Sequence, residues 1–131
     1  AYRYEVKKNE LPKTDIINLS QQIPLPKNKR DYTVVASRSH LSPETNIFIE
    51  KLKTEKGKVD FISSGSSIKL CLVAEGSADV YPRFAPTMEW DTAAGQAIAE
   101  AAGTTVIDFS TKKTLRYNKE NLLNNWFIVN S

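Results

Sequence analysis

The fold is decided by residues 63–103, which read SSGSSIKLCLVAEGSADVYPRFAPTMEWDTAAGQAIAEAAG. After the small-residue turn SSGSS, the apolar run IKLCLVA predicts a helix that ends near Gly76. ADVYPRF predicts a strand, with Pro82 at its end or at a sheet edge. A second helix, ending at Gly103, is predicted from small apolar residues at helical spacing, which allow close packing on a sheet. These residues are Ala93, Ala94, Ala97, Ile98, Ala101 and Ala102.

The flanking sequence continues this alternation of helices and strands. YTVVAS at 32–37 is short and β-branched, as is typical of a strand covered on both faces. Ser42 and Pro43 predict the start of a helix that stops at Gly57. Further strands are predicted at 59–63, 104–110 and 126–130. The predicted fold class is therefore α/β, with a mixed, largely parallel sheet flanked by helices.

Composition indicates one domain. The chain has 131 residues, 40% of them hydrophobic, which is enough for a usable core. Residues 32–131 are predicted to form this α/β core, and 1–31 a lead-in. The lead-in combines a strand-like start, AYRYEV, with an irregular connection that is rich in proline. Because AYRYEV begins without an initiator Met or a cap, we expect it to continue from an upstream segment.

Charge and hydropathy exclude several classes of protein. A net charge of +3 permits anionic ligands but is well short of a nucleic-acid-binding signature, so no DNA partner is expected. No apolar stretch reaches the roughly 20 residues of a membrane span, and the start lacks the order of a signal peptide. The single Cys71 lies in an apolar run and is interpreted as a buried thiol in a reducing compartment. We therefore expect a cytoplasmic protein.

Polar residues follow several predicted strands, where α/β sheets bind their ligands. They are His40, Ser66, Lys69, Arg83 and Asp91. A phosphate monoester is held by amides and hydroxyls of a Ser/Gly turn together with Lys and Arg, whereas Mg²⁺ prefers carboxylate oxygen. These residues alone predict an anion-binding α/β domain.

Each of these residues also has a structural interpretation. Asp91 can cap the helix that begins beside it, and His40 can be a surface residue at a strand end. Lys69 and Arg83 can be exposed charges or partners of Glu75 and Asp79. SSGSS lacks the Gly-Lys-Ser/Thr of a phosphate-binding Walker loop, so the turn alone is not diagnostic.

Residues 32–131 resemble the 3'(2'),5'-bisphosphate nucleotidases, the CysQ-type branch of the inositol monophosphatase superfamily. The resemblance is carried by VASRSH, by GSSIKLCLVAEGSADVYPRF and by the superfamily element W-D-x-A-A-G, present here as WDTAAG. It implies the carboxyl-terminal half of the superfamily's layered α/β sandwich. The implied reaction is Mg²⁺-dependent hydrolysis of adenosine 3',5'-bisphosphate to AMP and phosphate, in sulfur metabolism, with Li⁺ sensitivity. A peripheral inner-membrane location is also implied by the family.

The resemblance also implies roles for individual residues. Asp91 matches a metal ligand and would act in catalysis, besides capping its helix. His40, Ser66, Lys69 and Arg83 match positions that bind the nucleotide or its phosphate.

The resemblance is incomplete in one respect that matters for activity. The family's Asp-Pro-Ile/Leu-Asp-Gly-Thr element and its Glu ligands have no counterpart in residues 1–131. One carboxylate is too few for Mg²⁺. We therefore expect a carboxyl-terminal domain that lacks its amino-terminal metal-binding domain, is inactive alone, and associates with itself through an exposed sheet face.

Three alternatives remain open at this point. The chain could be a catalytically dead domain that binds a nucleotide or a protein, and a true start near Ala1 would favour this. It could belong to an inositol-phosphate phosphatase of the same superfamily. A basic nucleic-acid module using PKNKR and TKKTLR is the third, although these segments lack interleaved aromatic residues.

Overall fold

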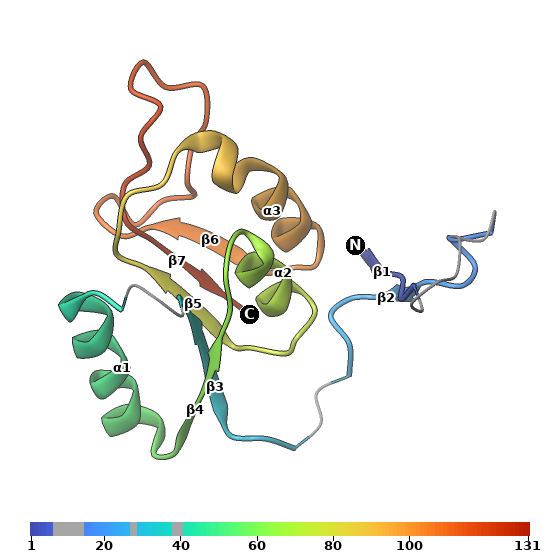
Figure 1. Ribbon diagram of the computed structural model, residues 1–131, viewed down its shortest axis with the longest axis horizontal. Coiled ribbons are helices and arrows are strands. Elements are labelled where there is room, and N and C mark those ends of the chain that lie inside the picture. The colour runs from blue at the N-terminus through green and yellow to red at the C-terminus, as the bar shows by residue number, and fades with distance from the viewer. Residues whose placement is uncertain (7–14, 27–28, 38–40) are drawn as a thin grey trace.

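A computed structural model describes residues 1–6, 15–26, 29–37 and 41–131. Its centre is a five-stranded sheet with strand order β4-β3-β5-β7-β6 (Figure 1). The strands are β3 (Tyr32–Ala36), β4 (Val59–Ser63), β5 (Val80–Arg83), β6 (Thr105–Asp108) and β7 (Phe127–Asn130). β3 pairs in parallel with β4 and β5, whereas β7 pairs antiparallel with β5 and β6, so β7 alone runs against the other four. The predicted mixed, largely parallel sheet is confirmed.

Helices cover both faces of this sheet. α1 (Pro43–Lys56) lies on one face, and α2 (Ile68–Ala74) and α3 (Glu89–Ala101) lie on the other (Figure 1). Successive residues of β3 point to opposite faces. Val34 therefore packs in the cluster that contains Ile49 of α1, and Val35 in the larger cluster that contains Leu70 of α2. The prediction that β3 is covered on both faces is confirmed.

α1 begins and ends where the sequence predicts. The Ser42 hydroxyl accepts a hydrogen bond from the Thr45 amide at 3.2 Å, Pro43 is the first helical residue, and Gly57 ends the helix with φ of +80°. A positive φ is available to glycine at little steric cost, which explains a glycine at this position.

Pro82 is neither at the edge of the sheet nor at the last position of its strand, contrary to the prediction. β5 is the central strand, and Pro82 lies opposite Ile128 of β7. The pairing of β5 with β3 is limited to Val80 and Val34. Pro82 lies beyond this paired position, so its missing N–H removes no bond from that ladder.

The predicted buried stripe of α3 is also wrong. The buried residues of α3 are Glu89, Thr92, Gly95, Gln96 and Ala99. Of the predicted stripe only Ala102, the residue just after the helix, is buried, and the other five members are exposed. The face that contains Thr92, Gly95 and Gln96 is buried because it packs on α2 and forms hydrogen bonds with the segment after β6. The Tyr117 hydroxyl, for example, donates to the Gln96 side chain at 2.7 Å.

The lead-in is more ordered than predicted. Within its described residues, β1 (Tyr2–Arg3) pairs antiparallel with β2 (Gln21–Gln22), where an irregular connection was expected. The backbone nitrogen of Ala1 donates to the carbonyl of Ala101 at 2.9 Å, and the Leu25 amide donates to the Glu75 carbonyl. These bonds fasten the lead-in beside α2 and α3. None of the described helices has the length and apolar composition that a membrane span requires.

Candidate anion-binding cavity

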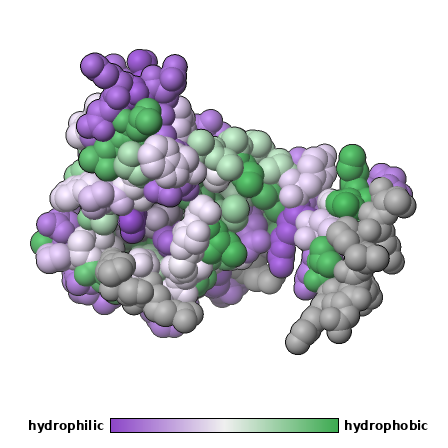
Figure 2. Space-filling view, turned by 45° about the horizontal axis from the view of Figure 1, so that its top comes forward, coloured by the Kyte–Doolittle hydropathy of each residue, from purple (hydrophilic) through white to green (hydrophobic). Residues whose placement is uncertain are grey.

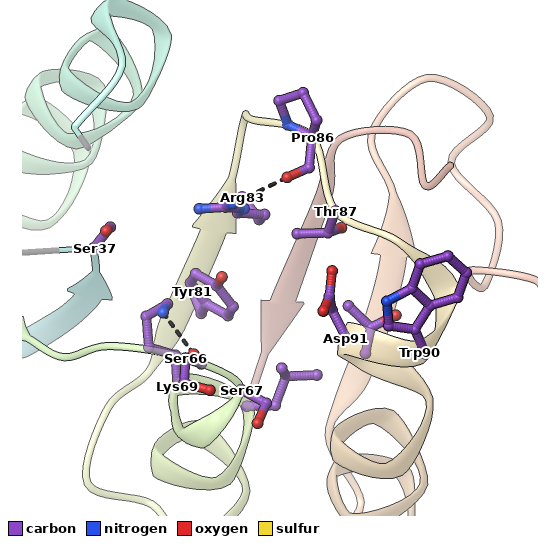
Figure 3. A pocket seen from close by; sticks show the side chains of 12 residues that line it. Ser37, Ser66, Ser67, Lys69, Tyr81, Arg83, Pro86, Thr87, Trp90 and Asp91 are labelled. Atoms are coloured by element: carbon purple, nitrogen blue, oxygen red, sulfur yellow. Dashed lines mark hydrogen bonds between the residues drawn. The ribbon is translucent and has the colours of Figure 1, made fainter. Parts of the chain in front are cut away.

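A cavity of about 460 Å³ lies where the carboxyl ends of the parallel strands meet the first turns of α2 and α3 (Figure 3). Its lining combines polar side chains from four separate segments. They are Ser37, Ser66, Ser67, Lys69, Leu70, Tyr81, Arg83, Pro86, Thr87, Trp90, Asp91 and Thr92. Four of the five residues predicted from the sequence are among them. The fifth, His40, lies outside the described residues.

Lys69 is buried beside the turn that precedes α2. Its side chain leaves the first turn of the helix, and the residue is only 3% exposed. Its Nζ donates to the Ser66 carbonyl at 2.6 Å and, more weakly, to the Ser64 carbonyl at 3.4 Å. The ammonium also lies 5.2 Å from the centre of the Tyr81 ring, a distance that permits a cation–π contact.

These surroundings make the Lys69 ammonium receptive to an anion. Burial lowers the pKa of Lys69, and the positive charge of Arg83 lowers it further. Carbonyl oxygens and a ring face compensate for lost water, but among the described residues Lys69 has no carboxylate in an ion pair. The negative charge of a phosphate in the cavity would raise the pKa of Lys69 and so counteract the lowering by burial and by Arg83.

Arg83 ends β5 and is half-buried. Its Nη2 donates to the Pro86 carbonyl at 3.0 Å, which holds the guanidinium at the cavity (Figure 3). Its Nε is buried and has no hydrogen-bond partner among the described residues. Buried donors are nearly always paired in native proteins.

The SSGSS turn supplies the part of the cavity wall beside Lys69 (Figure 3). Ser66 has φ of +51°, in the left-handed region that residues other than glycine seldom adopt. This conformation lets the chain turn sharply from β4 into α2, and the Ser66 carbonyl accepts from Lys69 within that turn. Strained backbone that persists in a native fold is common at binding sites.

Asp91 is exposed and lies in the first turn of α3. Its Oδ2 accepts a hydrogen bond from the Met88 amide at 2.8 Å, which is the carboxylate half of a capping box. The capping role predicted from the sequence is confirmed. It engages one of the two carboxylate oxygens of Asp91 in a single hydrogen bond.

The described residues do not by themselves form a magnesium site. Among them, no group of three or more His, Cys, Asp or Glu side chains is arranged to hold a metal ion. Within the described part of the chain, Asp91 is the only carboxylate that lines the cavity. A single carboxylate with one oxygen engaged in capping is a poor site for a cation that demands near-octahedral oxygen coordination.

The alternative that Lys69 and Arg83 form ion pairs with Glu75 and Asp79 is not what the structure shows. Asp79 forms an ion pair with Arg30, and Glu75 forms one with Arg3. Lys69 and Arg83 instead line the cavity. Sequence reasoning missed Tyr81 and Trp90 as cavity residues. Trp90 could have been inferred from its place beside Asp91 in the WDTAAG element, whereas nothing in the sequence places Tyr81 beneath an ammonium.

The parallel strands and the cavity at their carboxyl ends, lined by Lys69 and Arg83, define an α/β protein with a cationic cavity. Residues 5–130 match the inositol monophosphatase family, and the chain belongs to that family. The predicted fold class, a half of the family's layered sandwich, agrees with this membership.

Within the family, the chain is similar in sequence to CysQ nucleotidases. The 3'(2'),5'-bisphosphate nucleotidase CysQ of Salmonella typhimurium is 49% identical over 104 residues, which are 79% of this chain and 40% of that protein. CysQ of Escherichia coli is 46% identical over 103 residues, again 40% of its length. The chain thus spans about two fifths of these relatives.

Solved structures show the same relation. The crystal structure of CysQ from Bacteroides thetaiotaomicron, described as a bacterial member of the inositol monophosphatase family, superposes with a TM-score of 0.84 at 56% identity. It covers 96% of this chain, and this chain covers 46% of it. An inositol monophosphatase from Thermotoga maritima, at 24% identity and a TM-score of 0.57, shares the fold.

Proposed function

We propose that the protein to which this chain belongs is a phosphomonoesterase that removes the 3'-phosphate of adenosine 3',5'-bisphosphate, yielding AMP and phosphate. Similarity to CysQ nucleotidases over 79% of the chain supports the substrate class. The observation that carries the proposal is that the Arg83 guanidinium and the Lys69 ammonium line one cavity, where the charge of Arg83 lowers the pKa of Lys69. Phosphate oxygens satisfy both groups.

In this proposal the chain binds and orients the substrate. Arg83 and Lys69 donate to non-bridging oxygens of a phosphate, and the Ser66 hydroxyl together with His40 contacts the nucleotide. Water attacks phosphorus, the bond from phosphorus to the 3'-oxygen breaks, and that oxygen leaves with a proton as the ribose hydroxyl. Holding the phosphate so that attacking and leaving oxygens are in line is a large part of such catalysis.

Magnesium dependence belongs to the same proposal. Asp91 contributes one ligand, and the remaining carboxylates come from outside the chain, in the part of the protein by which its relatives are longer. The isolated chain then binds nucleotide without hydrolysing it. The absence of a metal-binding cluster among the described residues is also what a binding domain without catalysis would show, so activity of the longer protein separates these two candidates.

Substitution of the two cations tests the proposal in the full-length protein. Lys69→Met keeps the side-chain length without the charge, and Arg83→Lys keeps the charge without Nε and the fork. Each loses a charge-assisted hydrogen bond to phosphate. We therefore expect kcat/KM for adenosine 3',5'-bisphosphate to fall about ten- to hundredfold in each, with a raised KM.

Matched controls are Lys51→Met and Arg116→Lys, which change exposed residues away from the cavity lining. Their kinetic constants should stay within about twofold of wild type, because they remove no substrate contact. Wild-type kinetics in both the Lys69 and the Arg83 variants would remove the assigned roles.

A further inference from the structure

The first turn of α3 is tied to a distant loop by a buried carboxylate that does not reach the cavity. Glu89, the first residue of α3, is 8% exposed. Its Oε2 accepts the Asn118 amide at 2.7 Å, and its Oε1 accepts the Lys119 amide at 3.2 Å and the Lys119 ammonium. A carboxylate at a helix N-terminus is favoured by the helix dipole. The Glu89 oxygens, however, accept hydrogen bonds from residues 118 and 119 and not from the first turn of their own helix.

The same loop holds the turn at other atoms. Asn124 donates through Nδ2 to the Met88 carbonyl and to the Thr92 hydroxyl, each at 3.0 Å, and its amide donates to the Thr87 carbonyl at 2.8 Å. Lys119 connects the two contacts, because its ammonium also donates to Asn124 Oδ1 at 3.3 Å. Hydrogen bonds from residues 117–124 thus hold residues 87–92 in place.

Asp91 has no comparable support of its own. Among the described residues, its carboxylate makes one hydrogen bond, to Met88 in the same turn. Its position relative to Lys69 and Arg83 therefore depends on how the whole turn is anchored. In Figure 3 the Asp91 carboxylate points toward the side of the cavity where these two cations lie.

We propose that Glu89 is a positioning residue: by fastening the first turn of α3 to the 117–124 loop, it fixes the Asp91 carboxylate relative to the phosphate-binding cations. The proposal rests on the proposed function for its kinetic consequences. Glu89 touches no substrate in this account and acts through the backbone of its helix.

The test uses Glu89→Gln in the full-length protein. Glutamine keeps the shape but loses the charge and cannot present two acceptor oxygens to the loop. We expect kcat to fall at least about tenfold, because small displacements of reacting groups cost much in rate. KM should change by less than about twofold, since Lys69 and Arg83 are untouched. Hydrogen exchange of residues 87–92 and 117–124 should accelerate in the same variant.

The matched control is Glu120→Gln, an exposed carboxylate on the same loop. It should leave kcat, KM and both exchange rates as in wild type. A folded Glu89→Gln enzyme with wild-type kcat and wild-type exchange in residues 87–92 would overturn the proposal, and so would faster exchange with unchanged kcat. The first result removes the anchoring and the second removes its effect on Asp91.

Two further measurements keep the outcome decisive. If Glu89→Gln does not fold, Tyr117→Phe is a milder change to the same contacts, since the Tyr117 hydroxyl donates to Gln96 and lies 3.1 Å from the Thr92 hydroxyl. A smaller loss of kcat with KM retained supports the proposal, and wild-type kcat overturns it.

If the wild-type protein shows no phosphatase activity, the proposed function fails. The role of Glu89 is then tested by whether AMP protects backbone amides from hydrogen exchange. Protection of residues 87–92 that is lost in the variant supports it, and protection retained overturns it.

Discussion

Two cationic residues that line the cavity, Lys69 and Arg83, have few compensating partners among the described residues. Lys69 is surrounded by carbonyl oxygens and an aromatic face, and Arg83 retains a buried donor without a partner. A fold tolerates such groups when a ligand repays the cost of their desolvation. The sequence predicted both residues for this site but not their burial, because burial depends on Tyr81 and on turns from other segments.

A carboxylate outside the cavity makes a prediction about acid stability. Asp108, at the end of β6, is 7% exposed and accepts hydrogen bonds from Ser110, Thr111 and Asn125. Burial alone would raise the pKa of Asp108, but hydrogen bonds from the Thr111 amide, the Ser110 hydroxyl, Asn125 and the Ser110 amide outweigh it and lower the pKa from 3.8 to about 2. The carboxylate therefore stabilises the fold above pH 3.8, and this contribution is lost as the pH falls toward 2.

Asp108→Asn should lower the free energy of unfolding by about 2 kcal/mol at neutral pH, since one pKa unit corresponds to about 1.4 kcal/mol. The difference from wild type should shrink between pH 4 and pH 2, as urea unfolding at several pH values would show. Asp60→Asn, at an exposed position of β4, is the control. A constant difference across that pH range would contradict the assignment.

At the scale of elements, α2 and α3 meet at Gly95. A Cβ built at Gly95 would lie 3.1 to 3.3 Å from three atoms of Leu70, which is itself 1% exposed. Both helices present their first turns to the cavity, so their close contact sets its width. The predicted small-residue stripe placed close packing on the other side of α3, because alanine periodicity does not reveal that Thr92 and Gln96 find hydrogen-bond partners in a later segment.

Gly95→Ala should therefore be destabilising. Alanine gains about 1 kcal/mol of helix propensity over glycine, but the crowding against a well-packed leucine costs more, about 1–3 kcal/mol. The expected result is a lower free energy of unfolding, measured in urea. Adding Leu70→Val should recover part of the loss, because it frees the space that Cβ needs. A Gly95→Ala protein more stable than wild type would show that α2 and α3 do not pack this closely.

At the scale of the whole molecule, sequence patterns predicted the α/β class, the strands from 32 to 63, and the helix from Pro43 to Gly57. Local rules suffice there, because β-branched runs, proline and glycine act within a few residues. Patterns failed for Pro82 and for β2, whose environments are set by strand order and by contacts across the chain. Four of the five predicted site residues line one cavity because parallel strands bring their carboxyl ends together. The binding and catalytic roles of all five residues, and self-association through an exposed face, stay predictions.

In the proposed function, this chain carries the substrate-binding side of a phosphatase site, and the remaining metal ligands lie elsewhere in the protein. The decisive measurement is phosphate release from adenosine 3',5'-bisphosphate with Mg²⁺, compared between this chain alone and the full-length protein. We expect release by the longer protein and none by the isolated chain. Release by the isolated chain would contradict the metal assignment, and no release by either would contradict the proposed reaction.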